Sequence, residues 1–325
     1  MTKPTLSPRR WTPPPAVPGS PSTCADVRVI ATPGYGPEDV LVLPDGRVLT
    51  GLFDGRVVAI DPATERHTVV CDTGGRPLGL ELHPDGGVVV CDAYRGVLRL
   101  DVDDGTTTEL VTSVDGRAMM FCNNAAVARD GTIYFTDSST KFGFEHWRGD
   151  LLEHGASGRL FRRSPDGAVD QLADGLAFAN GVALAADESY VVVAETAGYA
   201  LRRYQLAGPD QGALVAFGDV LPGFPDNIST GTDGLIWVAI ASPRDKSLDL
   251  LLPRVPFLRT IVWALPQTIC SRSPSASSAR RRTTRRAGSC TTSRPPTPTS
   301  ASRPVCVRST ATCGWAASRN PRSPA

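Results

Sequence analysis

The sequence lacks the short motifs that mark the commonest hydrolases and nucleotide-binding enzymes. It contains no GxSxG, HExxH, GxGxxG or P-loop pattern, and its 8 cysteines form no CxxC pair. Its 4 histidines have no metal-ligand spacing, and we expect each to be a surface or structural residue: His67, His83, His146 and His154. These absences argue against a nucleophile-elbow hydrolase, a zinc protease and a zinc or dithiol site.

The sequence also has no long hydrophobic run. No segment approaches the roughly 20 consecutive apolar residues that a membrane-spanning helix needs. Residues 1–23 include Arg9 and Arg10, but proline-rich sequence follows where a secretory signal would have its apolar stretch. We therefore expect no transmembrane segment, a cytoplasmic location with reduced thiols, and a flexible Pro-rich N-terminal arm over residues 1–25.

Acidic residues are missing from the C-terminal part of the chain. Residues 268–325 contain 11 Arg but no Lys, Asp or Glu, so the first 267 residues carry 23 basic and 33 acidic side chains. The net charge of +1 for the whole chain therefore hides an acidic body. Such a body argues against nucleic acid or an anionic membrane surface as a partner.

The same C-terminal residues also lack Leu, Phe and Tyr. A segment with so little apolar surface cannot offset its chain entropy, which predicts a disordered Arg/Ser/Thr/Pro-rich tail over residues 268–325. All its residues belong to types whose codons can carry G or C in the second position, except Ile269, Val305, Val307 and Asn320. A one-base shift in a GC-rich gene produces this mixture, so we interpret the tail as a frameshift product that starts near Pro266–Cys270.

A genuine basic tail that contacts acidic partners is the alternative interpretation. The nucleotide sequence across codons 260–275 distinguishes the two. We expect an inserted or missing base there, and an unbroken reading frame would exclude the shift.

What the sequence does contain is a repeated hairpin pattern. A polar turn, a short β-branched run, a second turn and a second run recur between residues 36 and 242. The repeats begin at aspartates separated by 40, 45, 57 and 46 residues: Asp45, Asp85, Asp130, Asp187 and Asp233. Asp-Gly is a strong hairpin signal because both residues tolerate positive φ. Runs such as Val88–Val90 and Val191–Val193 fit strands that are buried on both faces.

This period indicates a β-propeller. Amphipathic helical patterns are absent, and short strands that repeat every ~40–50 residues are typical of propeller blades. Five repeats are visible, and the segment beyond the proposed shift would supply a sixth. We therefore predict an all-β fold, a six-bladed β-propeller with the sixth blade missing or incomplete, in which residues 26–267 form about five blades. A β-sandwich is the alternative, although it would show shorter and less regular spacing.

Hard oxygen donors precede the apolar run in several repeats. Glu38 lies in GPEDVLVL, Asn123 in FCNNAAV, Asn180 in FANGVAL, and Asp226 and Asn227 in FPDNIS. In a propeller, such equivalent positions meet at one mouth of the central channel. One of these residues alone would more simply cap a tight turn, but a carboxylate with several amide oxygens is the ligand set that Ca²⁺ prefers. The pattern therefore predicts a metal site.

Other polar residues have expected structural roles. Asp137 and Ser138, in FTDSS, are expected to link strands. Glu195 follows a buried strand in VVVAET, and a turn or edge position is expected for it rather than a place in the channel.

Longer motifs give a resemblance to a known family. Residues 178–206, FANGVALAADESYVVVAETAGYALRRYQL, followed by LPGFPDNIS, resemble the strictosidine-synthase-like branch of the calcium-dependent propeller superfamily. FTDSSTKF at residues 135–142 is a second match. That superfamily includes paraoxonases, regucalcin-type gluconolactonases and the adipocyte plasma-membrane-associated protein. The likeness runs from about Gly36 to Pro266.

The resemblance implies a six-bladed propeller with a metal ion in its central channel. The residues that match the family's ligands are Glu38, Asn123, Asn180, Asp226 and Asn227. Asp39 also agrees with the acidic neighbours that hold a second, structural calcium in paraoxonases. Asn124, however, replaces an aspartate of that pattern, so the resemblance does not extend to the second ion.

Two catalytic features of relatives have no counterpart. The paraoxonase histidine dyad has no match, and the catalytic glutamate of plant strictosidine synthases lies in the last blade, whereas residues 268–325 contain no glutamate. Those plant enzymes also lack the ligand set found here. These differences disfavour a strictosidine-synthase-type lyase that condenses an amine with an aldehyde, which is kept only as an alternative function.

The favoured hypothesis is hydrolysis of a small-molecule lactone or ester that depends on Ca²⁺ or another divalent cation. Asp226 is the candidate catalytic residue, as metal ligand and as general base or orienter for water. Asn123 and Asn180 would hold the ion and bind substrate, and Glu38 and Asn227 complete the ligand set. A non-catalytic ligand-binding propeller is the second alternative, because the fold does not dictate function.

Overall fold

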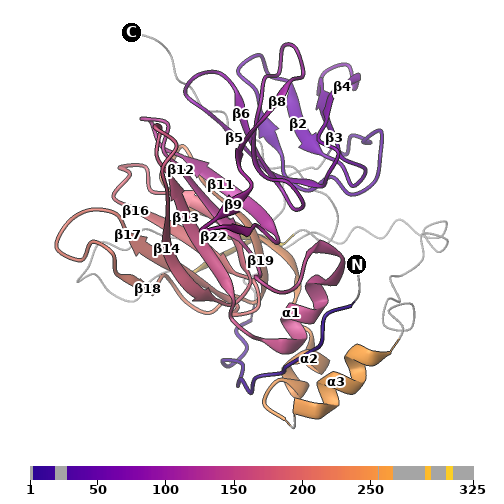
Figure 1. Ribbon diagram of the computed structural model, residues 1–325, viewed down its shortest axis with the longest axis vertical. Coiled ribbons are helices and arrows are strands. Elements are labelled where there is room, and N and C mark those ends of the chain that lie inside the picture. The colour runs from indigo at the N-terminus through magenta and orange to yellow at the C-terminus, as the bar shows by residue number, and fades with distance from the viewer. Residues whose placement is uncertain (1–2, 19–27, 255, 266–289, 294–304, 310–325) are drawn as a thin grey trace.

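Short strands joined by tight turns account for most of the described chain (Figure 1). The computed structural model describes residues 3–18, 28–254, 256–265, 290–293 and 305–309. Most of the predicted C-terminal tail, 268–325, therefore lies outside the described residues. The fold in the described part is nearly all-β, as the sequence predicts.

Five four-stranded sheets follow one another along the described chain. In the first four, consecutive strands pair antiparallel in the order of the sequence. Their strands are β1 (Leu41–Val42), β2 (Val48–Gly51), β3 (Arg56–Ile60) and β4 (His67–Asp72); β5 (Pro77–Leu82), β6 (Val88–Asp92), β7 (Gly96–Leu100) and β8 (Thr107–Val111); β11 (Cys122–Val127), β12 (Ile133–Asp137), β13 (Gly158–Arg163) and β14 (Val169–Leu176); and β15 (Ala179–Leu184), β16 (Tyr190–Glu195), β17 (Ala200–Gln205) and β18 (Leu214–Ala216). A short hairpin of β9 (Ser113–Val114) and β10 (Arg117–Ala118) lies between the second and third sheets.

The fifth sheet departs from this plan. Its first two strands, β19 (Gly223–Thr230) and β20 (Ile236–Pro243), form an antiparallel hairpin. The neighbour of β20 is β22 (Val305–Ser309), which runs parallel to it, and β21 (Cys290–Ser293) pairs with the outer edge of β22. Two short strands from the C-terminal region thus complete this sheet, whereas the earlier sheets use consecutive strands.

The predicted turns form as the sequence indicates. In each repeat, the leading aspartate accepts a hydrogen bond from the backbone N–H two residues later, at 2.8–3.2 Å. In three repeats the residue directly after the aspartate is a glycine with φ near +90°, which only glycine adopts without strain: Gly46, Gly86 and Gly131. This recurring local chemistry sets the spacing of the hairpins.

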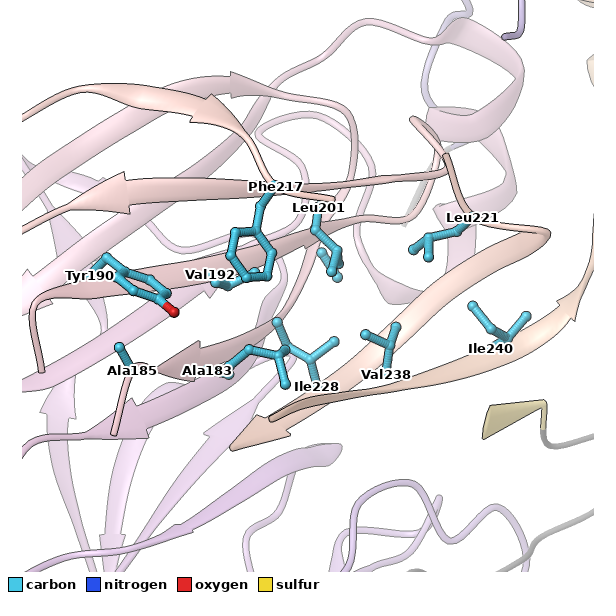
Figure 2. Close-up of a cluster of buried hydrophobic side chains, with 12 residues drawn as sticks. Ala183, Ala185, Tyr190, Val192, Leu201, Phe217, Leu221, Ile228, Val238 and Ile240 are labelled. Atoms are coloured by element: carbon cyan, nitrogen blue, oxygen red, sulfur yellow. The ribbon is translucent and has the colours of Figure 1, made fainter. Parts of the chain in front are cut away.

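Neighbouring sheets pack face to face through apolar side chains. Figure 2 shows such a cluster between the fourth and fifth sheets, in which Val192 and Leu201 face Ile228 and Val238. Equivalent clusters join the first to the second, the second to the third and the third to the fourth sheet. Residues Val191–Val193 are fully buried, which confirms the predicted strand with two covered faces.

The first strands of the sheets lie side by side around a common region. β5 contacts β1 and β11, and β15 contacts β11 and β19. Glycines permit this close approach: a Cβ at Gly79 would lie 2.7 Å from the Asn124 Cα, and one at Gly181 would lie 2.4 Å from the Ile228 nitrogen. Stacked sheets with adjacent first strands are the architecture of a propeller around a central channel.

Buried carboxylates make the same internal hydrogen bond in each of three consecutive sheets. Asp92, Asp137 and Glu195 each end the second strand of a sheet. Each accepts the backbone N–H of a residue just before the first strand of its own sheet, at 3.0, 2.7 and 2.8 Å, respectively. The predicted linking role of Asp137 is therefore confirmed, and Glu195 has a structural role of the same kind.

Three helices and the N-terminal residues lie together at one end of the molecule (Figure 1). α1 (Trp147–Glu153) follows a short 3₁₀ turn, η1 (Phe144–His146), between β12 and β13, whereas α2 (Lys246–Leu251) and α3 (Pro256–Ala264) follow β20. None of the helices in the described residues has both the length and the apolar character needed to cross a bilayer.

Residues 3–18 of the predicted arm pack against these helices. The Trp263 indole N–H donates to the carbonyl of Pro4, and the Arg9 N–H donates to the carbonyl of Glu153, both at 2.8 Å. Leu6 is buried in a cluster with Phe142 and Trp263. The arm thus makes specific contacts in this structure, and its flexibility stays a prediction.

Candidate metal centre

The predicted site residues lie at the beginnings of the first strands. Glu38 precedes β1, whereas Asn123 and Asn180 are the second residues of β11 and β15, and the pair Asp226–Asn227 lies at the middle of β19. A cavity of about 1180 Å³ is lined by residues of all five first strands. Glu38, Asp226 and Asn227 line this cavity. The two buried residues Asn123 and Asn180 are 4% exposed.

Direct hydrogen bonds bring four of the five predicted residues together. The Asn180 amide Nδ2 donates to Oδ1 of Asp226 at 2.7 Å. The Asn227 Nδ2 donates to Oε2 of Glu38 at 3.2 Å, across 189 positions of sequence. Glu38 and Asp226 are close enough that the charge of Asp226 raises the pKa of Glu38. These contacts join the start of the first sheet to the fourth and fifth sheets.

Asn123 is held separately from these four residues. Its Nδ2 donates to Oγ of Ser138 at 2.9 Å, and that hydroxyl donates to the carbonyl of Ala179 at 2.7 Å. Within the described residues, no direct hydrogen bond joins Asn123 to Glu38, Asn180, Asp226 or Asn227. Ser138 therefore links β12 to β11 and β15, as predicted, and fixes the orientation of the Asn123 amide.

Asn124 is hydrogen-bonded to the predicted ligand Asn227 but was not itself among the predicted ligands. Its Nδ2 lies 3.2 Å from Oδ1 of Asn227 and 3.4 Å from Oδ2 of Asp39, and its Oδ1 accepts the N–H of Val182 at 3.1 Å. Asp39 also accepts the N–H of Leu80 at 2.9 Å. The sequence signals for these two residues were their positions, directly after Glu38 and Asn123, and the resemblance to the paraoxonase pattern of acidic neighbours, with which Asp39 agrees and from which Asn124 departs.

Two amide oxygens in this region are buried without a partner. Oδ1 of Asn123 and Oδ1 of Asn180 have no hydrogen-bond donor among the described residues. In both side chains the Nδ2 group is already engaged, which leaves the oxygen as the unsatisfied end. A buried acceptor without a donor is costly, and such a group in a native structure points to a missing ion or water.

The negative charges of the Glu38 and Asp226 carboxylates are also poorly compensated by nearby positive groups. Burial raises the pKa of Glu38 well above its usual value, and the charges of Asp226 and Asp39 add to that rise. Burial likewise raises the pKa of Asp226 to about 6, although the hydrogen bond from Asn180 opposes this. Arg76 is the cation that lowers the pKa of Glu38. A bound cation would stabilise both ionised carboxylates.

Arg76 was missed by sequence reasoning. It is 5% exposed, and its guanidinium donates to the carbonyls of Gly36 and Pro77 at 2.9 and 3.3 Å. The guanidinium also lies over the rings of Phe53 and Phe144, at 5.6 and 5.4 Å from their centroids. No sequence pattern marks Arg76, because its contacts with Gly36, Phe53 and Phe144 come from segments distant in the chain.

Aromatic side chains flank the donors. Phe121, Phe178 and Phe224 each precede a predicted ligand by two residues and belong to one buried cluster with Tyr199. The rings of Phe121 and Phe178 meet edge to face at 5.4 Å. This apolar layer excludes water from the strand beginnings, which strengthens electrostatic interactions there.

The donor chemistry fits a hard cation that takes oxygen ligands. In the part of the chain that the structure describes, no group of three or more His, Cys, Asp or Glu side chains is arranged to hold a metal. A metal here would therefore need amide oxygens beside the carboxylates. Two partnerless amide oxygens and two carboxylates supply such a set, which suits Ca²⁺ and does not suit zinc.

Solved structures with a similar fold are β-propellers. A gluconolactonase from Xanthomonas campestris aligns with a TM-score of 0.54 and 23% identity, over 70% of this chain and 83% of its own. Regucalcin from Agrobacterium tumefaciens, described as a calcium-binding protein, aligns with a TM-score of 0.54 and 18% identity, over 66% and 71%. At these identities the likeness shows the fold: the protein is a β-propeller of the gluconolactonase and regucalcin type.

Sequence comparisons identify the family. The model of strictosidine synthase matches residues 123–209, and that of the strictosidine synthase-like N-terminal region matches residues 24–60. Protein STRICTOSIDINE SYNTHASE-LIKE 10 of Arabidopsis thaliana is 33% identical over 78% of this chain and 73% of its own length. The adipocyte plasma membrane-associated protein of Bos taurus is 36% identical, over 71% of this chain and 60% of its own. The chain belongs to the strictosidine synthase-like family.

The matched residues include three predicted donors. Glu38 lies in the N-terminal match, and Asn123 and Asn180 lie in the second. The chain spans 64% of the length of STRICTOSIDINE SYNTHASE-LIKE 13 of Arabidopsis thaliana, to which it is 34% identical, and 60% of the adipocyte protein of Salmo salar. The family assignment is thus clear, whereas the activity of the chain is a separate question.

Proposed function

We propose that this chain is a hydrolase of a small lactone or ester that depends on a bound divalent cation, Ca²⁺ in the first instance. The observation that carries the proposal is the partnerless buried oxygen of Asn180, whose amide nitrogen bonds to Asp226, together with the equally partnerless oxygen of Asn123 at the corresponding position of the neighbouring sheet. The gluconolactonases and the calcium-binding regucalcin that share the fold are consistent with it.

In this proposal Glu38, Asn123, Asn180, Asp226 and Asn227 hold the cation. When bound, the cation supplies Lewis acidity, which polarises a substrate carbonyl and stabilises the oxyanion that forms. Asn227, through its hydrogen bond to Glu38, keeps that carboxylate oriented. Asn124 donates hydrogen bonds to both Asn227 and Asp39 and thereby holds these two side chains in place.

Asp226 is the proposed general base. One of its oxygens accepts the Asn180 amide, and its other oxygen has no hydrogen-bond partner among the described residues. That free oxygen is available to orient water and to take its proton. Burial raises the pKa of this carboxyl to about 6, and a bound cation would lower it again, so the group would be ionised at neutral pH and able to accept a proton.

Two other functions remain open. A strictosidine-synthase-type lyase would join an amine to an aldehyde, and the family membership favours it as the second candidate. A non-catalytic propeller would bind its ligand in the same channel without turnover. In either alternative a cation or a water would have to satisfy the partnerless oxygens.

A calcium titration tests the proposal. The metal-free protein is titrated with Ca²⁺ while a panel of aliphatic lactones and aryl esters is assayed, and unfolding is followed in parallel. We expect hydrolysis that rises with Ca²⁺ and is lost with a chelator, together with a stabilisation of about 2.7 kcal/mol at one hundred times the dissociation constant. Stabilisation without turnover would favour the binding propeller. The absence of both stabilisation and turnover would rule out the metal site.

A further inference from the structure

A second cavity lies apart from the channel. It has a volume of about 380 Å³ and is bounded by the N-terminal arm, the end of α1 and the loop that joins β16 to β17. None of its lining residues lines the channel cavity. Its polar and aromatic lining consists of Arg9, Arg10, Trp11, His154, Glu195 and Arg202, and its volume is within the range of small-molecule sites.

Donors without partners face this cavity. His154 is 7% exposed, and its ring Nδ1 is buried without a hydrogen-bond partner in the described residues. The guanidinium groups of Arg9 and Arg10 have neither an ion pair nor a hydrogen bond within that same part of the chain. Nε of Arg202 is likewise buried without a partner. The buried donors of His154 and Arg202 are costly unless something accepts their hydrogen bonds, whereas the exposed guanidinium groups of Arg9 and Arg10 are available to bind an anion.

The charge of the lining is strongly positive. Three arginines face a single carboxylate, Glu195, whose Oε1 already accepts the N–H of Ala177 and whose Oε2 is 3.7 Å from Arg202. Burial, with a smaller effect from the nearby Arg259, lowers the pKa of His154 to about 4, so its ring is neutral at pH 7. A neutral imidazole can still donate one hydrogen bond through Nδ1.

The end of α1 does not repel an anion here. The last carbonyls of a helix carry partial negative charge, but Arg259 covers them by donating to the carbonyls of Leu152 and Glu153, at 2.7 and 3.4 Å. The same guanidinium donates to the carbonyl of Arg9 at 2.6 Å and so positions the arm beside the cavity.

An apolar wall completes the cavity. Trp11 stacks on His154, with ring centroids 4.0 Å apart and the planes 27° from parallel. The remaining lining is small: Gly155, Ala156, Gly175, Ala177 and Gly198. This part of the lining has no large side chain, which leaves room for a flat group.

We propose that this cavity is a binding site for a small organic anion, in which a carboxylate or phosphate group lies among Arg9, Arg10 and Arg202 and accepts a hydrogen bond from His154. A planar organic portion of the ligand packs near Trp11. The site is separate from the channel, and it does not rest on the proposed hydrolysis.

Binding to the full chain tests the proposal. Benzoate and phenyl phosphate serve as anionic probes, with benzamide as the neutral probe, in calorimetric titrations and thermal unfolding at pH 7. We expect at least one of the anions to bind and to raise the unfolding temperature, and benzamide to do neither. A comparison of the affinities for benzoate and phenyl phosphate shows whether the site prefers a carboxylate or a phosphate.

Variants locate the binding. Arg10→Ala removes an exposed guanidinium that makes no contact in the described residues, so we expect normal unfolding without ligand and at least about tenfold weaker anion binding. His154→Phe keeps a ring beside Trp11 and removes Nδ1, and should weaken binding similarly. Arg66→Ala, an exposed arginine elsewhere, is the matched control. Binding unchanged in Arg10→Ala and His154→Phe, equal binding of benzamide, or no binding of either anion would overturn the proposal.

Discussion

Replacement of Asp226 by Asn is expected to lower calcium-dependent hydrolysis of a lactone by roughly 10²–10⁴-fold, the usual contribution of a general base. The substitution keeps an oxygen that can accept the Asn180 amide, which is now 2.7 Å from Oδ1, so the strands should remain in place. It removes the charge that would bind the cation and the oxygen that would take a proton. The loss should therefore appear both in kcat at saturating Ca²⁺ and in the affinity for Ca²⁺.

The control for this variant is Asp219→Asn. Asp219 is exposed, lies shortly before β19 and makes no contact in the described residues, so its change should leave both quantities unaltered. Thermal unfolding of both variants in chelator shows whether the fold is intact. If Asp226→Asn hydrolysed the substrate within a few-fold of the parent at saturating Ca²⁺, Asp226 would not be the base.

Replacement of Asp92 by Ala is expected to lower the free energy of unfolding by about 3 kcal/mol or more, because several buried donors lose their acceptor and each unsatisfied one costs about 1–3 kcal/mol. Asp92 is fully buried. It accepts the Thr73 hydroxyl at 2.8 Å and the backbone N–H groups of Arg76, Tyr94 and Arg95 at 2.9–3.1 Å. Alanine would leave these donors without an acceptor inside the second sheet.

Urea unfolding measures this effect. Asp92→Asn keeps one acceptor oxygen and should cost less than Asp92→Ala, whereas Asp103→Ala, at an exposed turn, should change stability by no more than about 0.5 kcal/mol. A small loss for Asp92→Ala, equal to that of Asp103→Ala, would show that the buried carboxylate does not hold the sheet together.

The hairpins were predictable because their causes are local. Each repeat begins with an aspartate whose side chain accepts a nearby N–H, and Gly46, Gly86 and Gly131 supply the positive φ that the turn needs. Val191–Val193 are buried on both faces, as an unbroken β-branched run indicates. The all-β propeller followed from these signals and the family from the longer motifs, whereas a count of six blades stays a prediction.

The hydrogen bonds that buried carboxylates accept at the ends of the second strands were only partly predictable. Asp137 was expected to link strands, but nothing in the sequence showed that Asp92 and Glu195 make the same bond in neighbouring sheets. Each bond spans 16 or 18 residues and depends on how the last residue of one strand meets the beginning of another. Pattern alone does not give that geometry.

By itself the sequence determined the repeat, the turn chemistry and the oxygen-rich residues near each strand beginning, because all three are set by neighbours within a few positions. Only the tertiary structure decided that Asn227 bonds to Glu38, that Asn124 connects Asn227 with Asp39, and that the oxygens of Asn123 and Asn180 are left without donors. These contacts join segments up to 189 positions apart, and they exist because the packed sheets bring their first strands together.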